Sequence, residues 1–286
     1  MSVFEKGAAA FYGLGAMGLP IATRLAGVLP GLAVVDANPE RAAAVAADVP
    51  SVSADAERAE AAEVAFLCLP SPDVTRQVVQ RLVEGGCRLV IDFGAEPPDI
   101  AAEFADTCAA AGAVYCDVPV FGSPVMAARG DLYFLFSGPQ DIAADFAGLA
   151  EAAGFRMRNA GPTGAASTIK ILQNALGTAN LAAAAEALRV CEAAEIGTET
   201  FINVVKECNG IGISSVFERY ASDMAARHDS GDGRLRIAAK DSAAAAKLAD
   251  RHGVNTPVLT TAADRYRKAA EAGMADQQFT QVIDAD

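Results

Sequence analysis

The sequence predicts an α/β, doubly wound sheet followed by an all-α domain. Up to residue 162, short apolar runs bounded by Gly and Pro alternate with helical patterns, as is typical of a parallel sheet covered by helices on both faces. Beyond Gly161 and Pro162 the strand pattern ends and only helical periodicity remains. We therefore expect two domains, residues 1–162 and 163–286, joined by a long helix.

The first domain alternates six expected strands with five expected helices. The strands are residues 8–12, 32–36, 64–69, 89–93, 114–120 and 132–137, and the helices are residues 19–28, 39–47, 73–83, 98–111 and 140–153. In the second domain a long helical segment, 164–196, ends before Gly197. Four further helices are expected at 200–208, 214–228, 240–252 and 257–272.

Composition excludes several classes of function. The 286 residues carry a formal charge of −13, which argues against binding nucleic acid or an anionic membrane surface. No apolar run approaches the roughly 18 residues that span a bilayer, and residues 1–6 contain no hydrophobic stretch of a signal peptide. With 52% hydrophobic residues, the chain has the composition of a globular protein with a large core.

Cysteine and histidine usage points to a cytoplasmic protein without a metal site. None of the six cysteines forms a CxxC pair, and several lie in apolar runs, so we expect buried free thiols in a reducing compartment. The two histidines, His228 and His252, lack partners at ligand spacing. There is no GxSxG motif, so a serine hydrolase is not expected either.

A glycine-rich loop is the first chemical signal. Gly13, Gly15 and Gly18 form a GxGxxG between an expected strand and an expected helix, which is the Rossmann-type context for a dinucleotide pyrophosphate. Gly13 allows the tight turn, Gly15 allows close approach of the phosphates, and Gly18 allows close packing of helix on strand. An ordinary glycine turn is the alternative interpretation. The expected cofactor-binding residues of the loop are Gly13, Leu14, Gly15, Ala16, Met17 and Gly18.

Asp36 lies 18 residues after the last glycine, at the end of the second expected strand. A carboxylate there can bond both ribose hydroxyls of adenosine and repels a 2′-phosphate. Residues 37–39 contain no Arg, and Arg41 belongs to the next expected helix. The pattern therefore favours NAD over NADP, with a simple helix cap as the alternative role of Asp36.

Lys170 and Asn174 are four residues apart and share one face of the long helix. A lysine beside a cofactor pocket loses its proton more easily than in water, so it can accept a hydroxyl proton as hydride leaves the carbon. Asn174 can hold the amine or the substrate oxygen. Taken alone, such a pair is in most proteins a solvated helix face, so its functional interpretation needs outside support.

Four motifs in order resemble those of the β-hydroxyacid dehydrogenases, the group of 3-hydroxyisobutyrate dehydrogenase and tartronate semialdehyde reductase. They are the loop Gly13–Gly18, the segment Asp117–Val120 with Gly122, Ala127, Gly130 and Leu132, the segment Gly164–Asn174, and Lys240 with Asp241. The resemblance extends over nearly the whole chain. It implies a nucleotide-binding domain and a helical domain like the C-terminal domain of 6-phosphogluconate dehydrogenase, which drives assembly into a dimer or tetramer.

The same resemblance implies NAD(P)-linked interconversion of a short β-hydroxy acid and its semialdehyde or keto form. Lys170 falls on the catalytic lysine of the family, a general acid/base, and Asn174 on its partner. Gly122 and Ser123 would hold the acidic group of the substrate. Lys240 would lie near the nicotinamide, and Leu69 and Pro70 would flank the cofactor.

Two departures from the family pattern concern the substrate. The usual serine of the second motif is Phe121 and its second glycine is Ser123, while the usual Ser-Thr pair after residues 89–93 is Gly94 and Ala95. Phe121 donates no side-chain hydrogen bond, so we expect it to change the shape of the substrate site, unless it is a core aromatic facing away. An imine reductase and a non-catalytic NAD-binding protein on the same fold are the alternative functions.

Overall fold

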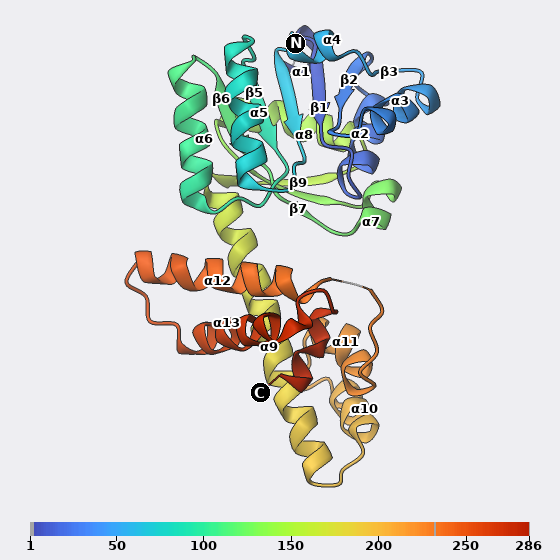
Figure 1. The fold of residues 1–286 in the computed structure, drawn as a ribbon, viewed down its shortest axis with the longest axis vertical. Helices are drawn as coiled ribbons and strands as arrows, with labels where there is room; N and C mark the ends of the chain where they lie inside the picture. The colour runs from blue at the N-terminus through green and yellow to red at the C-terminus, as the bar shows by residue number, and fades with distance from the viewer. Residues whose placement is uncertain (1–2, 232, 286) are drawn as a thin grey trace. The chain divides into compact units, whose positions relative to one another are not determined.

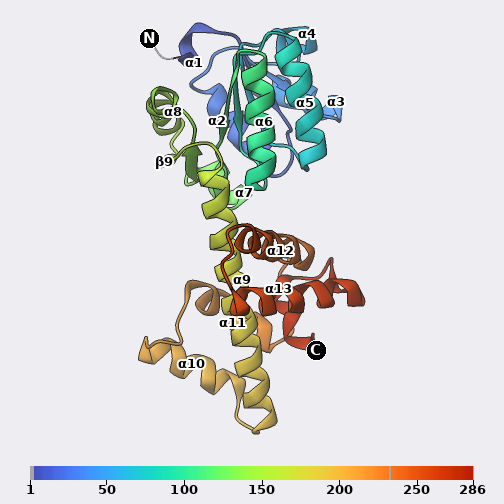
Figure 2. The ribbon, with the colours of Figure 1, turned by 90° about the vertical axis from the view of Figure 1, so that its left-hand side faces the viewer.

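The computed structural model describes residues 3–231 and 233–285. Its contacts divide the chain into two compact units, Met1–Lys170 and Ile171–Asp286 (Figures 1 and 2). This contact division follows Lys170, because the first turns of helix α9 (Ala165–Ala193) are hydrogen-bonded to the sheet of the first unit. The boundary at residue 162 stays a prediction.

The described part of the first unit holds a nine-stranded sheet with the order β3-β2-β1-β4-β5-β6-β8-β7, and β9 pairs with β8. The strand order reverses between β1 and β4, which is the doubly wound arrangement predicted above. The strands are β1 (Ala9–Tyr12), β2 (Leu32–Val35), β3 (Val52–Ser53), β4 (Val64–Leu67), β5 (Leu89–Asp92), β6 (Val114–Asp117), β7 (Val120–Phe121), β8 (Tyr133–Ser137) and β9 (Arg156–Gly161).

Helices cover both faces of this sheet, as Figure 2 shows. Alternate residues of a strand point to opposite faces, so Phe11 packs in one core with α2 and α8, while Ala10 and Tyr12 pack in a second core with α5 and α6. The helices are α1 (Val3–Lys6), α2 (Gly18–Ala26), α3 (Pro39–Asp48), α4 (Ala56–Glu60), α5 (Pro72–Glu84), α6 (Pro98–Ala110), α7 (Pro124–Arg129) and α8 (Gln140–Ala152).

The expected strand 114–120 is in fact two strands. The chain breaks at Val118 and Pro119, because Pro cannot donate to the ladder, and it resumes as the short β7. The chain then returns through the six-residue α7, so β8 pairs antiparallel with β6 and β7, and the sheet is mainly rather than wholly parallel. The edge strand β9 was not expected, because its sequence is polar and half exposed. The other unexpected elements are the short β3, α1, α4 and α7.

The described part of the second unit is helical, as predicted. Its helices are the rest of α9, α10 (Thr198–Cys208), α11 (Ser215–Ala225), α12 (Leu235–Arg251), α13 (Pro257–Ala269), a π-helical turn η1 (Ala270–Met274) and a 3₁₀ helix η2 (Phe279–Asp284). Helix α12 begins at Leu235, five residues before the expected Lys240, because Leu235 and Ala238 are buried in the same core as Tyr266.

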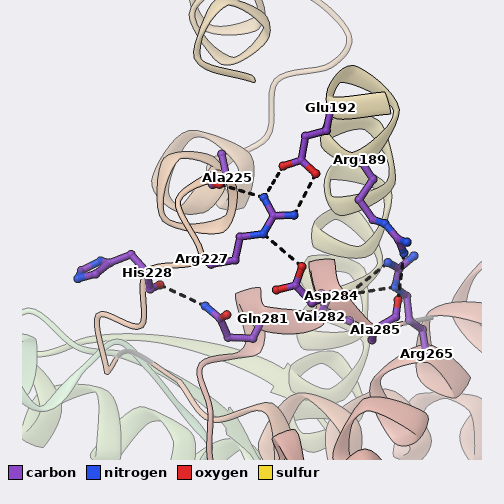
Figure 3. A network of polar contacts seen from close by, with 10 residues as sticks. All are labelled: Arg189, Glu192, Ala225, Arg227, His228, Arg265, Gln281, Val282, Asp284 and Ala285. Carbon is purple, nitrogen blue, oxygen red and sulfur yellow. Dashed lines mark hydrogen bonds and ion pairs between the residues drawn. The ribbon is translucent and has the colours of Figure 1, made fainter. Parts of the chain in front are cut away.

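Arginines fasten the C-terminal η2 to the helices around it (Figure 3). Arg227 makes a bidentate ion pair with Glu192 of α9 and donates to Asp284 of η2. Arg265 of α13 donates through Nε and Nη2 to the carbonyl of Val282, at 3.3 and 3.2 Å. The last turn of the described chain is therefore part of the folded helical unit and not a loose tail.

All six cysteines are free thiols. Cys87, Cys108, Cys116 and Cys191 are buried as expected, but Cys68 is half-buried and Cys208 is exposed. Among the residues that the structure describes, no helix combines the length and the apolar character needed to cross a bilayer.

Burial of Asp92 gives a pH-dependent stability. Its carboxylate, at the end of β5, is buried among the backbone N–H of Gly94 and the Tyr115 hydroxyl, which donate at 2.8 Å each. Burial raises the pKa of Asp92 from 3.8 to about 6, the two hydrogen bonds oppose that shift, and the charge of Asp117 adds to it. The folded state therefore holds a proton that the unfolded chain releases between these values, so stability falls as pH rises through this window.

We expect Asp92→Asn to raise the free energy of unfolding by about 2 kcal/mol at pH 8 and by roughly half of that at pH 5, because the amide carries no charge to bury. Urea unfolding at both pH values measures the difference. The exposed Asp106→Asn is the control and should show no such pH dependence. Equal effects of Asp92→Asn at the two pH values would contradict the assignment.

Candidate functional site

The glycine loop occupies the carboxyl edge of the sheet, between β1 and α2. Gly13 has φ +96°, a conformation that favours glycine, and a Cβ there would collide with the carbonyl oxygen of Cys68. A Cβ on Gly18 would collide with the carbonyl oxygen of Gly13. The turn and the helix–strand packing therefore require glycine at these two positions, as the motif predicts.

Gly15 differs from its neighbours because a Cβ there would meet nothing within 4 Å. It opens on a cavity of about 680 Å³. The volume suits a dinucleotide, and the residues at the start of α2 and Asp36 line the cavity together. The cavity is lined by Tyr12, Gly13, Gly15, Ala16, Met17, Gly18, Val35, Asp36, Ala37, Arg41, Cys68, Leu69, Pro70, Val74, Val78 and Arg81.

The structure brings most of the predicted cofactor residues together in this cavity. Leu14 is different, because its side chain is buried in the core and its contribution is its backbone. The N–H of Leu14 donates to Asp36 Oδ2 at 2.7 Å, and the N–H of Asn38 donates to Asp36 Oδ1 at 2.9 Å. Asp36 thus ties the glycine loop to the end of β2.

Arg41 is a cavity residue that the sequence analysis missed. Its Nη1 lies 3.3 Å from Asp36 Oδ1, because side chains in the first turn of a helix lean back toward the N-terminus. Burial alone would raise the pKa of Asp36, but the hydrogen bonds from Asn38 and Leu14 and the charge of Arg41 outweigh it and lower that pKa. The position of Arg41 five residues after Asp36, the acid at the strand end, was the sequence signal that could have placed it in the cavity.

A second part of the site lies where α9 begins. Asp117 Oδ1 accepts from the N–H of Gly164, and Oδ2 accepts from the N–H of Ser167, both at 2.9 Å. Ser137 Oγ accepts from the N–H of Ala166 at 2.6 Å. Burial raises the pKa of Asp117, and the bonds from Gly164 and Ser167 oppose that rise. These contacts fix the N-terminus of α9 on the ends of β6 and β8.

Lys170 follows one turn later and points to β7. Its Nζ donates to the carbonyl of Val120 at 3.1 Å and lies 4.1 Å from the centroid of the Phe121 ring. Phe121 is half-buried and contacts the ring of Tyr133 edge-on, with 6.2 Å between centroids. Phe121 therefore faces the lysine instead of pointing away into the core.

Gly122 and Ser123 follow at once. Gly122 has φ +136°, and a Cβ there would press on the side chain of Leu132, so this sharp turn also needs glycine. Ser123 caps α7, with its Oγ accepting from the N–H of Met126 at 3.4 Å. The hydroxyl of Ser123 thus has a structural role already, which sequence reasoning did not anticipate.

In the second unit, Asn174 is joined to Asp241 of α12. Asn174 Nδ2 donates to Asp241 Oδ2 at 2.8 Å, while Lys240 Nζ lies 4.0 Å from Asp241 Oδ1. Lys240 is largely exposed. Asp241 is thus the acid that orients the amide of Asn174. Within residues 3–231 and 233–285, no group of His, Cys, Asp or Glu side chains is arranged to hold a metal ion.

Comparison with known proteins identifies the family of this chain. Residues 8–161 match the family described as the NAD-binding domain of 6-phosphogluconate dehydrogenase. Residues 164–285 match the family described as the NAD-binding domain of NADP-dependent 3-hydroxyisobutyrate dehydrogenase. The chain belongs to the β-hydroxyacid dehydrogenase family. It is therefore one of a family of NAD(P)-dependent oxidoreductases, and the Rossmann-type and helical domains predicted from its sequence are those of that family.

Individual relatives align with nearly the whole length of this chain. It is 27% identical to NAD-dependent L-serine dehydrogenase of Pseudomonas aeruginosa, covering 96% of this chain and 95% of the relative. It is also 27% identical to 3-sulfolactaldehyde reductase of Escherichia coli, covering 97% and 95%. The solved 3-hydroxyisobutyrate dehydrogenase of Mycobacterium tuberculosis superposes with a TM-score of 0.85 at 25% identity, covering 97% and 98%.

An imine reductase of Bacillus cereus shares the fold, with a TM-score of 0.61 at 19% identity over 97% of this chain and 98% of that one. This likeness concerns the fold alone. The alternative of an imine reductase thus has a more distant basis than the hydroxy-acid relatives.

Proposed function

We propose that this protein interconverts a short β-hydroxy acid and its semialdehyde or keto form, with Lys170 as the general acid/base. The observation that carries the proposal is the placement of Lys170 Nζ at the Val120 carbonyl, on a helix whose start is fixed by Asp117. This lysine and the dinucleotide-sized cavity belong to the same unit. A fixed amine in the unit that would hold a hydride-transfer cofactor supports a role in moving the hydroxyl proton.

The cavity residues would hold the cofactor through groups that the structure orients. Backbone N–H groups at the start of α2 would face the pyrophosphate, Asp36 the adenosine ribose, and Leu69 and Pro70 the cofactor's flank. When bound, the nicotinamide supplies the hydride acceptor or donor. Lys240 is assigned to the nicotinamide end from the family motif.

The substrate residues divide the remaining work. Lys170 takes the proton from the hydroxyl in oxidation and returns it to the carbonyl oxygen in reduction. Asn174, held by Asp241, would orient the reacting oxygen. Backbone at Gly122 and the hydroxyl of Ser123 would bind the acidic group, and Phe121 would give the site a less polar wall than a serine gives.

Replacement of Lys170 by Ala tests the proposed chemistry. We expect Lys170→Ala to lower kcat by about 10²–10⁴-fold and to leave the affinity for NADH nearly unchanged, because general acid/base catalysis is worth about that factor and Lys170 does not line the cofactor cavity. NADH absorbance with 3-hydroxyisobutyrate, L-serine and glycerate measures turnover. Lys247→Ala, exposed on α12, is the control. Near-normal turnover by Lys170→Ala would overturn the mechanism.

We propose NAD as the preferred cofactor, since the Asp36 carboxylate repels a 2′-phosphate. Arg41, 3.3 Å from that carboxylate, is the opposing charge. Asp36→Ala should therefore shift the relative affinity toward NADPH by about tenfold. Arg41→Ala should lower the affinity for NADPH below that of the unaltered protein and leave the affinity for NADH within about twofold. Fluorescence titration of both cofactors against the unaltered protein and the two variants measures the six affinities. Tighter binding of NADPH than of NADH to the unaltered protein would refute the preference.

We also propose a homodimer or homotetramer assembled through the helical unit. The family resemblance carries this proposal, and Val190, Val204 and Val258 are exposed apolar side chains on three helices of that unit. Light scattering at micromolar protein should give at least twice the chain mass of 29.3 kDa. A monomer mass would contradict this assembly.

Six free thiols support a reducing, cytoplasmic location.

A further inference from the structure

Phe121 and Lys170 form a contact with a specific electrostatic character. The ammonium nitrogen lies 4.1 Å from the ring centroid, well inside the roughly 6 Å over which a cation is attracted to an aromatic face. The same nitrogen donates to the carbonyl of Val120, the residue before Phe121. Strand β7 therefore offers Lys170 two negative partners, one carbonyl dipole and one ring face.

Both sides of this contact are anchored. Phe121 is paired with Tyr133 in the ladder between β7 and β8, and the left-handed Gly122 directly after it sets the course of the chain. The helix that carries Lys170 is fixed at its start, where the N–H groups of Gly164 and Ser167 donate to Asp117. The ring thus lies against the amine because two separate parts of the sheet place it there.

A ring face distinguishes the two protonation states of the amine. The negative face of the aromatic quadrupole attracts an ammonium and has little attraction for a neutral amine. An interaction that strengthens as positive charge forms on Nζ lowers the barrier to forming it. A flexible aliphatic side chain of similar volume would fill the space without this effect.

We propose that Phe121 is a positioning residue for proton transfer, whose ring face stabilises the ammonium that forms on Lys170 during oxidation of the hydroxy acid. This inference rests on the proposed function. The hydroxyl O–H bond breaks and its proton passes to Nζ, while the C–H hydrogen leaves with both electrons to the oxidised nicotinamide. The carbon–oxygen bond becomes a carbonyl, and the positive charge gained by Lys170 lies on the ring of Phe121.

A graded change of the ring quadrupole tests this role without changing the shape of the Phe121 side chain. Phe121 is replaced by its mono-, di- and trifluorinated forms, which remove the quadrupole stepwise, and kcat and KM are measured for 3-hydroxyisobutyrate and L-serine. The measurements use saturating NAD⁺ at the alkaline pH where kcat is constant. We expect log kcat to fall steadily along the series, by about tenfold in total, with KM within about twofold. A kcat that is constant along the series overturns the proposal.

A matched control separates electrostatics from packing. Phe104 lies under the guanidinium of Arg76 at 5.8 Å, in α6 and away from the lysine, so trifluorination there should leave kcat unchanged. Phe121→Leu should lower kcat as much as the trifluorinated ring does, and Phe121→Tyr should keep kcat near that of the unaltered protein. Loss on Phe121→Leu with no loss on fluorination assigns Phe121 to packing alone.

NMR supplies a measure that does not depend on turnover. The chain has six lysines, so the Lys170 ε-methylene signal can be assigned from its loss in Lys170→Arg. We expect this signal to be shifted upfield by the Phe121 ring current and to return to the usual range in Phe121→Leu. An unshifted signal in the unaltered protein overturns the contact even if the enzyme is active. A protein that reduces no NAD⁺ with either acid, while the signal is shifted, overturns the proposed function and this role with it.

Discussion

The hydrogen bonds from the first turn of α9 to Asp117 are the constraint on which the site depends. They bind the start of a 29-residue helix to the end of β6, and Lys170 lies one turn further on. A carboxylate at a helix N-terminus meets both unpaired N–H groups and the positive end of the helix dipole, which offsets the cost of burying its charge. Because the helix is regular, fixing this end also fixes which side of α9 carries the lysine.

The same device recurs along the carboxyl edge of the sheet. Asp36 directly after β2, Asp92 at the end of β5 and Asp117 at the end of β6 each accept backbone N–H groups from loops or helix starts at this edge. Asp36 accepts from Leu14 and Asn38, Asp92 accepts from Gly94, and Asp117 accepts from Gly164 and Ser167. Loops at this edge lack ladder partners, so a strand-end carboxylate satisfies their donors and sets their path. The penalty is burial, which raises the pKa of Asp92 and of Asp117, and the charge of Asp117 adds to the rise at Asp92. A rigid cofactor edge is thus obtained at some expense in stability.

Local sequence patterns made the fold predictable, but side-chain contacts between residues distant in sequence could not be predicted from such patterns. The GxGxxG loop and the apolar strands were predicted because glycine sterics and burial act within a few residues. Strand β9 was missed because an exposed edge needs no apolar run, and Arg41 because the direction of its side chain depends on where α3 begins. The contact between Phe121 and Lys170 joins β7 to α9, and no spacing rule relates two such elements.

The division of the chain has a consequence for how the chemistry is organised. The proposed proton carrier Lys170 is in the unit that holds the cofactor cavity, while Asn174 and Asp241 are in the helical unit. The contacts of the amine with Val120 and Phe121, and the bonds that Asp117 accepts from the start of α9, all lie within the first unit. In the proposed mechanism Asn174 would add orientation of the reacting oxygen from the helical unit. The residues proposed to bind the acidic group, Phe121, Gly122 and Ser123, are in the same unit as Lys170, so substrate preference and proton-transfer geometry would be set together.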